Sequence, residues 1–238
     1  MRKTGHVIFC ATLVAVSGLR IGGSDDMLQI GGADLTAIKH PVTRQPYIPG
    51  SSIKGKIRSE LEKRDGRFGG RNGSEPCGCG ECLICRIFGP HKNLRHNLGP
   101  TRIIVRDAQP LKPAALESKT STMIDRQTGT AAGGSLRTEE RVAAGAEFGM
   151  EIGIQLFDID KHCEYTQDKD GSKTRHKGDD ALLVFVLDGI KLLGRTGLGS
   201  GIGKGSGQIR IKDPKRFDLS NPIASLDEWP LSQEATQA

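Results

Sequence analysis

Hydrophobic residues alternate with polar ones along one stretch of the chain and recur at helical spacing along another. The alternation covers residues 147–157, where every second position is apolar: Phe148, Met150, Ile152, Ile154 and Leu156. A period of two predicts a strand with one buried face. β-Branched and apolar runs predict two further strands, one over residues 6–17 and one within "TRIIVRDAQPL", where Ile103 and Val105 share a face opposite Ile104.

A helix is predicted from residue 51 to about residue 64, because Ile53, Ile57 and Leu61 recur every four residues. Ser51 or Ser52 is expected to cap its N-terminus. The first turns also carry three basic residues: Lys54, Lys56 and Arg58. Cations at this end oppose the helix dipole, so helix stability does not explain them, whereas a bound phosphate chain would. The alternative is an ordinary solvated basic face.

The remaining segments complete an α+β pattern. Residues 180–194, "DALLVFVLDGIKLLG", fit either a strand or a helix, and a glycine-rich loop then leads to a last strand. The order strand, helix, strand occurs twice, which predicts a ferredoxin-like α+β domain. We expect one domain over residues 1–213, with insertions at about 65–98 and 112–140 and a C-terminal tail over 214–238.

Charge and composition favour a polyanionic partner. The 238 residues carry a formal net charge of +6, with 32 glycines and 4 % aromatic residues. The basic excess is concentrated between Arg44 and Arg71, where eight Lys and Arg residues accompany three acids. Such a cluster is typical of proteins that bind nucleic acid. Since no apolar run approaches the roughly 20 residues of a membrane span, no membrane association is expected.

Four of the six cysteines lie within "CGCGECLIC", as Cys77, Cys79, Cys82 and Cys85. Four thiolates this close predict a structural zinc site that contributes folding energy. An iron–sulfur cluster is the alternative, and His91 or His96 could replace a cysteine if the spacing is too tight. Reduced thiolates imply a cytoplasmic protein, although residues 7–16 imitate the apolar part of a secretory signal.

Two glycine motifs look like nucleotide-binding loops but lack essential residues. Gly50 and Lys56 fit the frame of a phosphate-binding loop, yet Ile57 stands where Ser or Thr must hold magnesium, and prolines replace the preceding strand. Glycines at every second position from 197 to 207 do not fit the dinucleotide-binding pattern either. They do let backbone amides approach a ligand closely, and Lys204 among them could contact a phosphate.

Three acids precede the basic helix: Asp25, Asp26 and Asp34. Acids on a basic surface are either solvated or catalytic, and the sequence pattern does not choose between these roles. Among the six histidines, His40 is of interest only because it lies near Asp34 in the sequence.

In their order along the chain, these motifs resemble the RAMP backbone subunit of type III CRISPR effector complexes, closest to the Csm type. The resemblance covers roughly residues 6–211 and includes "GLRIGGSDD", "IPGSSIKGKIR", "CGCGECLICRIFG", "STMIDRQTGTAAGG" and "RVAAGAEF". It implies a ferredoxin-like, RRM-related palm with a zinc-binding insertion and a thumb β-hairpin. It also implies that copies stack along a guide RNA, each inserting its thumb between stretches of guide–target duplex.

The resemblance also implies roles for individual residues. Asp34 matches the aspartate that cleaves target RNA with Mg²⁺ or Mn²⁺. The implied RNA-binding residues are Arg20, Ser51, Lys54, Lys56, Arg58 and Lys204, the implied thumb residues are Met123, Ile124 and Asp125, and the implied ligands of the structural zinc are Cys77, Cys79, Cys82 and Cys85. Two positions depart from the family pattern, since Arg20 replaces a usual histidine and His40 replaces a usual acid.

The implied partners are a CRISPR guide RNA, target RNA, further copies of the chain and other type III effector subunits. Two alternatives remain at this point. The chain could be a non-catalytic scaffold that only binds guide RNA, or an endoribonuclease that processes guides. The presence of Asp34 favours cleavage over a pure scaffold, and no catalytic histidine for guide processing can be placed.

Overall fold

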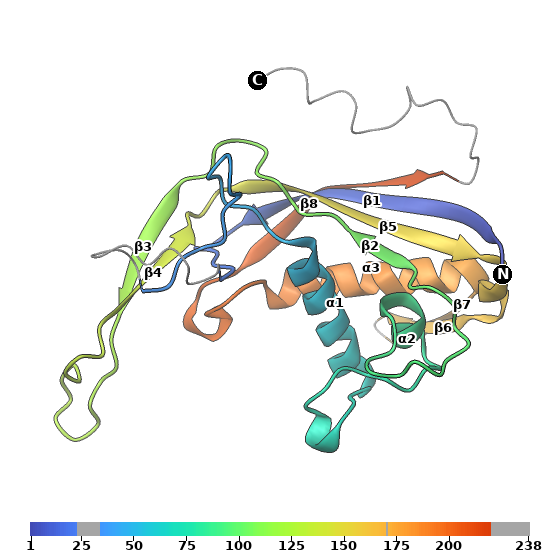
Figure 1. The fold of residues 1–238 in the computed structure, drawn as a ribbon, viewed down its shortest axis with the longest axis horizontal. Coiled ribbons are helices and arrows are strands. Elements are labelled where there is room, and N and C mark those ends of the chain that lie inside the picture. Colours follow the sequence, from blue (N-terminus) through green and yellow to red (C-terminus); the bar gives the residue numbers. More distant parts are fainter. Residues whose placement is uncertain (23–33, 170, 220–238) are drawn as a thin grey trace.

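Four antiparallel strands form the central sheet of this computed structural model, which describes residues 1–22, 34–169 and 171–219. They are β1 (Lys3–Ala15), β2 (Ile103–Val105), β5 (Glu147–Phe157) and β8 (Ile209–Asp218), in the spatial order β2-β5-β1-β8 (Figure 1). The long strand β1 pairs with β5 on one side and with β8 on the other. The five alternating apolar residues predicted for β5 are all buried, so this strand supplies much of the core face.

Two long helices pack together with the sheet around one hydrophobic core (Figure 1). In α1 (Gly50–Asp65) the residues Ile53, Ile57 and Leu61 are fully buried, as their spacing predicts. In α3 (Gly178–Thr196) the segment that fitted both strand and helix is helical, with two acids in the first turn and an arginine in the last. This charge order favours a helix because it complements the helix dipole. None of the helices within the described ranges is both long and apolar enough to cross a membrane.

Insertions between these elements carry the shorter helices and strands. They are η2 (Arg71–Gly73) and α2 (Leu83–Phe88) after α1, β3 (Leu116–Ser121) and β4 (Arg137–Val142) after β2, η3 (Asp158–His162), β6 (Glu164–Lys169) and β7 (Ser172–Lys177) after β5, and η4 (Ile202–Lys204) after α3. The β3–β4 hairpin projects from one end of the central sheet (Figure 1). The predicted mixture of helices and antiparallel strands is therefore confirmed.

Two predicted segment boundaries are wrong. β8 continues through Pro214 to Asp218, so the domain boundary that we expected after residue 213 falls inside a strand. A proline is tolerated here because β8 is an edge strand whose pairing with β1 shifts register between Cys10 and Thr12. The strand predicted from "TRIIVRDAQPL" is shorter than expected and comprises only β2. Residues 220–238 of the predicted tail lie outside the described residues.

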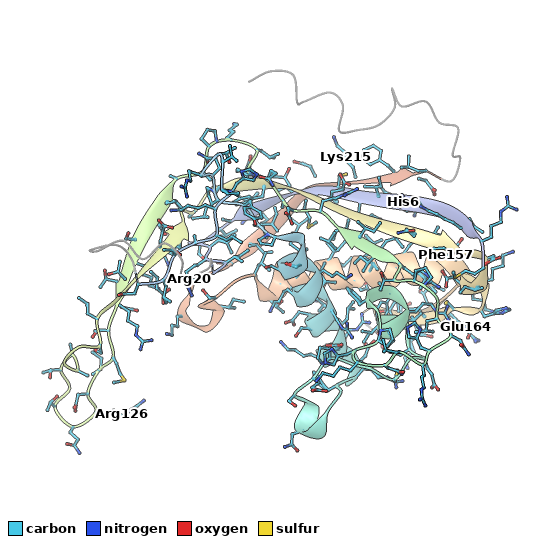
Figure 2. All side chains as sticks on the ribbon, viewed as in Figure 1. His6, Arg20, Arg126, Phe157, Glu164 and Lys215 are labelled. Atoms are coloured by element: carbon cyan, nitrogen blue, oxygen red, sulfur yellow. The ribbon has the colours of Figure 1, made fainter. Side chains whose placement is uncertain are left out.

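A buried ion cluster joins the cysteine-rich insertion to the sheet. The fully buried Arg102 donates from Nε and Nη2 to the two carboxylate oxygens of Asp160, at 2.7 and 2.8 Å. Arg86 of α2 donates to the same carboxylate at 3.0 Å. The Arg102 guanidinium also lies over the ring of Phe157, 4.7 Å from its centre, at the end of the sheet where Figure 2 labels that ring. Because a buried charge is tolerated only when paired, this cluster fixes α2 against the end of β5.

Candidate nucleic-acid interface and metal centre

Asp34 lies at the base of the β3–β4 hairpin, where its exposed side chain contacts β4. Its Oδ2 accepts a hydrogen bond from the backbone N–H of Thr138 at 2.7 Å. The next residue, Leu35, forms a parallel bridge with Glu139 and accepts a 2.8 Å hydrogen bond from the N–H of Glu140. The second carboxylate oxygen, Oδ1, makes no hydrogen bond to the described residues. Within the described ranges, the carboxylate is therefore held by one oxygen and makes no hydrogen bond through the other.

Glu140 fastens the segment that follows Asp34. Its Oε1 accepts a hydrogen bond from the N–H of Ala37 at 3.2 Å, and its Oε2 pairs with Nζ of Lys39 at 2.9 Å. His40 closes the next turn, since its Nδ1 accepts hydrogen bonds from the N–H groups two and three residues further on, both at 3.3 Å. Residues 34–40 are thus fixed to the hairpin base by backbone and side-chain contacts together.

The three basic residues of α1 differ in what they contact. Lys54 is half-buried and makes no ion pair within the described part of the chain; burial lowers its pKa, and the neighbouring Arg58 lowers it further. Lys56 pairs with a glutamate one turn later at 2.8 Å. Arg58 donates from Nε to Glu62 and from Nη2 to the carbonyl oxygen of Cys77, both at 2.8 Å. Lys54 is therefore the cation of α1 that is most available to an external anion.

The predicted serine cap of α1 is wrong. The helix begins at Gly50 with Pro49 in the N-cap position, and no side chain caps it by a hydrogen bond. Pro49 directs the extended chain straight into Gly50, one residue before Ser51, which is left exposed on the first turn. The carboxylate of Asp107 accepts a 2.7 Å hydrogen bond from the Gly50 N–H, so a protein anion already occupies this donor.

The glycine loop packs against Arg20, although the two lie far apart in the sequence. Nε of Arg20 donates a hydrogen bond to the hydroxyl of Ser200 at 2.9 Å. The backbone carbonyl oxygen of Arg20 accepts a hydrogen bond from the Ser200 N–H at 2.8 Å. Gly199 has a positive φ of 82°, and a Cβ there would lie 2.3 Å from the Arg20 carbonyl oxygen, so only glycine fits. Lys204 lies exposed in η4 of the same loop. The structure therefore brings Arg20 and the glycine loop together, as a common binding surface requires.

The predicted thumb residues lie beyond the paired part of the β3–β4 hairpin. Met123 is 65 % exposed and Ile124 is 55 % exposed. Asp125 closes the turn that follows by accepting hydrogen bonds from the N–H groups of Thr128 and Gln127, which hold its pKa below the usual value. Large apolar side chains that gather on an exposed hairpin indicate a contact surface.

The four clustered cysteines bring their sulfur atoms within 4.8 Å of one another. The Sγ–Sγ distances are 3.8 Å between Cys77 and Cys82, 3.7 Å between Cys79 and Cys85, and 3.7 Å between Cys77 and Cys85. A tetrahedron with metal–sulfur bonds of about 2.3 Å has edges of about 3.8 Å. A multinuclear cluster would spread its ligands further apart. The geometry therefore suits one metal ion bound by four sulfurs.

Backbone donors support these sulfurs. The N–H of Cys82 points to Sγ of Cys79 at 3.5 Å, and the N–H of Cys85 points to Sγ of Cys82 at 3.4 Å. Burial alone would raise the pKa of Cys79, but hydrogen bonds from backbone N–H groups outweigh it and lower the pKa to about 6. Thiolates are the form that binds metal. Among the described residues, His91 and His96 do not belong to this ligand group.

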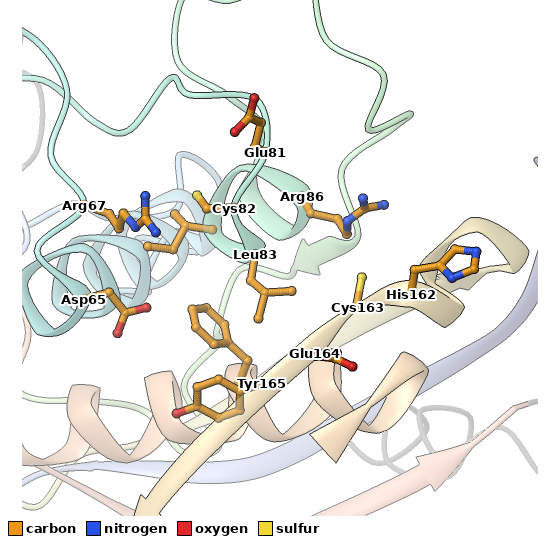
Figure 3. A pocket seen from close by; sticks show the side chains of 12 residues that line it. Asp65, Arg67, Glu81, Cys82, Leu83, Arg86, His162, Cys163, Glu164 and Tyr165 are labelled. Carbon is orange, nitrogen blue, oxygen red and sulfur yellow. The ribbon is translucent and has the colours of Figure 1, made fainter. Parts of the chain in front are cut away.

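A cavity of about 370 Å³ lies beside the cysteine cluster, between the end of α1, α2 and β6 (Figure 3). Cys82 and Leu83 line it from α2, and Glu164 and Tyr165 line it from β6. Its charged side chains include Arg86, which is already paired with the buried Asp160. Arg67, Glu81 and His162 also line the cavity, and we assign no role to it.

Sequence reasoning missed the residues that hold the site in place. Glu62 accepts hydrogen bonds from Arg58 and from the backbone N–H of Cys77 at 2.9 Å, so α1 supports the cysteine cluster. The four-residue spacing of Arg58 and Glu62 could have indicated their pairing. Thr138 and Glu140 gave no such signal, because they meet Asp34 and its neighbours across about 100 residues of chain.

Comparison with known proteins places the chain in a family. The RAMP superfamily profile matches residues 12–210, and the chain belongs to this superfamily. Proteins named CRISPR system Cms endoribonuclease Csm3 are 38 % identical to it in Methanocaldococcus jannaschii (89 % of this chain and 80 % of the relative) and 37 % identical in Methanothermobacter thermautotrophicus (90 % and 87 %). Within the superfamily the chain therefore belongs to the Csm3 family.

A solved structure supports the same placement. The chain is similar to one in the crystal structure of a Csm3-Csm4 subcomplex of the type III-A CRISPR-Cas interference complex, with a TM-score of 0.55 and 27 % sequence identity. The match covers 92 % of this chain and 82 % of the other. The family resemblance inferred from the motifs is thereby confirmed.

Proposed function

We propose that this protein is a repeating backbone subunit of a type III CRISPR ribonucleoprotein, where it binds guide RNA and cleaves complementary target RNA at regular intervals. Family membership supports the assembly, because the Csm3 relatives are named endoribonucleases and the similar structure is a subcomplex with Csm4. The observation that carries the cleavage role is the carboxylate of Asp34, which β4 holds by Oδ2 while Oδ1 makes no hydrogen bond to any described residue. Such a ribonucleoprotein acts in the cytoplasm.

The proposed palm is a ferredoxin-like, RRM-related domain. The order β1-α1-β2-β5-α3-β8 supports this, because it follows the β-α-β-β-α-β scheme with β1 and β5 at the centre of the sheet. Residues 65–98 then form a zinc-binding insertion and residues 112–140 form the thumb. The proposed domain ends after β8 rather than at residue 213.

The proposed guide-binding surface combines α1 with the glycine loop. On α1, Lys54 contributes a cation that forms no ion pair with the residues the structure describes, and Lys56, Ser51 and Arg58 lie in the same first turns. Lys204 contributes from the glycine loop, and Arg20 contributes from the segment after β1 that packs against this loop. These contacts address phosphates and sugars, so they bind guides of any sequence.

The proposed cut is an in-line displacement within the target RNA. The 2′-oxygen forms a bond to the adjacent phosphorus while the bond from phosphorus to the 5′-oxygen breaks. Asp34 Oδ1 accepts the 2′-hydroxyl proton, and water supplies a proton to the 5′-oxygen. The products are a 2′,3′-cyclic phosphate and a 5′-hydroxyl. One carboxylate makes a modest base, so most of the rate comes from holding the bent target in the in-line pose.

A divalent ion fits this site only in part. As an alternative to its role as base, Oδ1 of Asp34 would hold Mg²⁺ or Mn²⁺ as a hard oxygen ligand, and the described residues offer no group of three such ligands around it. Phosphate oxygens of the RNA would therefore complete the shell, as Mg²⁺ commonly requires. When bound, the ion neutralises charge that develops on the phosphate.

The metal of the cysteine cluster is proposed to be structural zinc. The sulfur distances near 3.7 Å support this, and so does the absence of any open ligand position in a set of four thiolates. Because Arg58 and Glu62 contact Cys77, a bound metal would then also hold the guide-binding helix α1 in place.

Cleavage by a reconstituted complex tests the proposal. The protein is assembled on a guide RNA with its cognate subunits, and a labelled complementary RNA is added with Mg²⁺ or Mn²⁺. Cuts at regular intervals, with 5′-hydroxyl ends, are expected. Intact target bound to a correctly assembled complex would instead identify the chain as a guide-binding scaffold, in which Asp34 serves only to hold Thr138.

A further inference from the structure

Arg141 of β4 connects three separate parts of the chain. Its side chain covers Gly18, where an added Cβ would lie 2.2 Å from the arginine Nε. Nε donates to Oε1 of Glu117 on β3 at 2.6 Å, and Nη1 donates to the hydroxyl of Ser206 in the glycine loop at 3.0 Å. The side chain is 19 % exposed. Arg141 is therefore held between the thumb base, the segment after β1 and the glycine loop.

Backbone contacts around Arg141 join the same parts. Gly207 of the glycine loop donates to the carbonyl oxygen of Gly18 at 2.9 Å. Leu19 exchanges hydrogen bonds with Val142, at 2.9 and 2.8 Å. From β3, Nζ of Lys119 reaches the carbonyl oxygen of residue 204 at 3.3 Å. The thumb base and the glycine loop thus contact each other through side chains and backbone.

The same strand also holds the cleaving carboxylate. Thr138, three residues before Arg141, supplies the N–H that binds Oδ2 of Asp34. One end of β4 therefore contacts Asp34 and the other contacts the glycine loop. We propose that Arg141 is a positioning residue for cleavage, which fixes the distance between the guide-binding glycine loop and Asp34. This inference rests on the function proposed above.

A direct phosphate contact is the competing role for Arg141. Two of its three guanidinium nitrogens already donate to Glu117 and Ser206. Lysine would keep the charge but has no planar fork to reach both partners at once, so charge and geometry can be separated by substitution. A substitution at Gly18 provides a second test, because a methyl group there would displace the Arg141 side chain without removing its charge.

The experiment uses the complex assembled on guide RNA, under single turnover. Arg141→Ala, Arg141→Lys, Gly18→Ala and the double variant Gly18→Ala/Arg141→Ala are compared with the wild type. Arg175→Ala is the matched control, because Arg175 pairs with Glu164 across the β6–β7 hairpin, which packs against α3. Cleavage rate, the distribution of cut positions, target affinity and thermal melting are measured.

Each single substitution at positions 18 and 141 is expected to slow cutting about tenfold to a hundredfold and to spread the cut over neighbouring phosphates. Target affinity should change less than threefold, and Arg175→Ala should cut like the wild type. The double variant should be no slower than Arg141→Ala, since both changes remove one interaction. Rescue by Arg141→Lys, or additive effects in the double variant, would overturn the proposal. A wild-type complex that does not cut would reject the proposed function itself.

Discussion

The backbone N–H of Thr138 holds Oδ2 of Asp34 at 2.7 Å, so β4 fixes the carboxylate that we propose to cleave RNA. Asp34 thus has two separable properties, a hydrogen-bond acceptor used by β4 and a negative charge that the proposed cleavage requires. Asparagine keeps the first and loses the second, while alanine loses both.

Asp34→Asn and Asp34→Ala are both expected to lower cutting at least about a hundredfold, because a proton acceptor at the 2′-hydroxyl contributes in this range. Affinity for the target should stay level or rise slightly, since an acid beside phosphates repels them. Only Asp34→Ala should lower the melting temperature, through loss of a hydrogen bond worth about 1 kcal/mol. Cleavage assays and thermal melts on the same samples check this. Near-normal cutting by Asp34→Asn would show that Asp34 has only a structural role, as a hydrogen-bond acceptor for Thr138.

Zinc should be present at about one ion per chain and should show no visible charge-transfer absorption. Cys82→Ser, or a strong chelator, should lower thermal stability or assembly while leaving the cut position unchanged. Cys163→Ser is the control, because Cys163 is buried but lies outside the cluster. Elemental analysis with melting curves provides the measurement. Stoichiometric iron with sulfide would contradict the zinc assignment.

Acidification should release this metal as protons compete for the thiolates. Burial raises the pKa of Cys82 to about 11 and also raises the pKa of Cys85, so protons compete with the metal for these sulfurs. Metal-dependent stability should therefore be present at neutral pH and be lost as the pH falls from there. Melting curves across this pH range, with the metal content measured in parallel, show whether metal release accompanies the loss of stability. Loss of stability with the metal still bound would assign the effect to other groups.

Removing one partner of the buried Arg102–Asp160 pair should be severe. Asp160→Ala leaves the fully buried guanidinium of Arg102 uncompensated, which typically costs about 3–5 kcal/mol. Because Arg86 shares the same carboxylate, the cysteine-rich insertion should loosen first. Urea denaturation against Asp218→Ala, an exposed acid paired on β8, gives the comparison. Equal stability of the two variants would show that the cluster adds little.

The elements that the sequence predicted well are those with local signals. Alternation in β5 and the four-residue spacing in α1 depend only on neighbouring side chains, and both elements form as predicted. The four cysteines were found because they lie within nine residues. Asp34 was assigned through a family resemblance, since one acid in a polar loop has no distinguishing local pattern.

The errors arise where distant segments decide the outcome. A proline normally ends a strand, yet Pro214 lies within β8 because the edge position and the shifted register with β1 leave room for it. Ser51 or Ser52 was expected to cap α1, but Asp107, two residues after β2, accepts the hydrogen bond of the Gly50 N–H instead. Arg58 stays a predicted RNA contact, and its Nε and Nη2 also bind Glu62 and the carbonyl oxygen of Cys77. Apart from the pairing of Arg58 with Glu62 one helical turn later, these contacts cannot be inferred from spacing along the chain.

Lys54 should make the main electrostatic contact of α1 with the guide. Lys54→Ala is expected to weaken binding of all guides alike and to reduce the slope of log affinity against log salt by about 0.7–0.9, the value for one phosphate contact.

Burial lowers the pKa of Lys54, whereas a bound phosphate favours its charged form, so the affinity for the guide should fall as the pH rises from neutral towards that pKa. Lys54→Arg, which stays charged, should lose this pH dependence. Lys191→Ala, a charge removal on α3, serves as the control in salt and pH titrations without divalent ions. A loss confined to one guide sequence, or an equal loss in the Lys191 variant, would show that Lys54 does not bind the guide backbone.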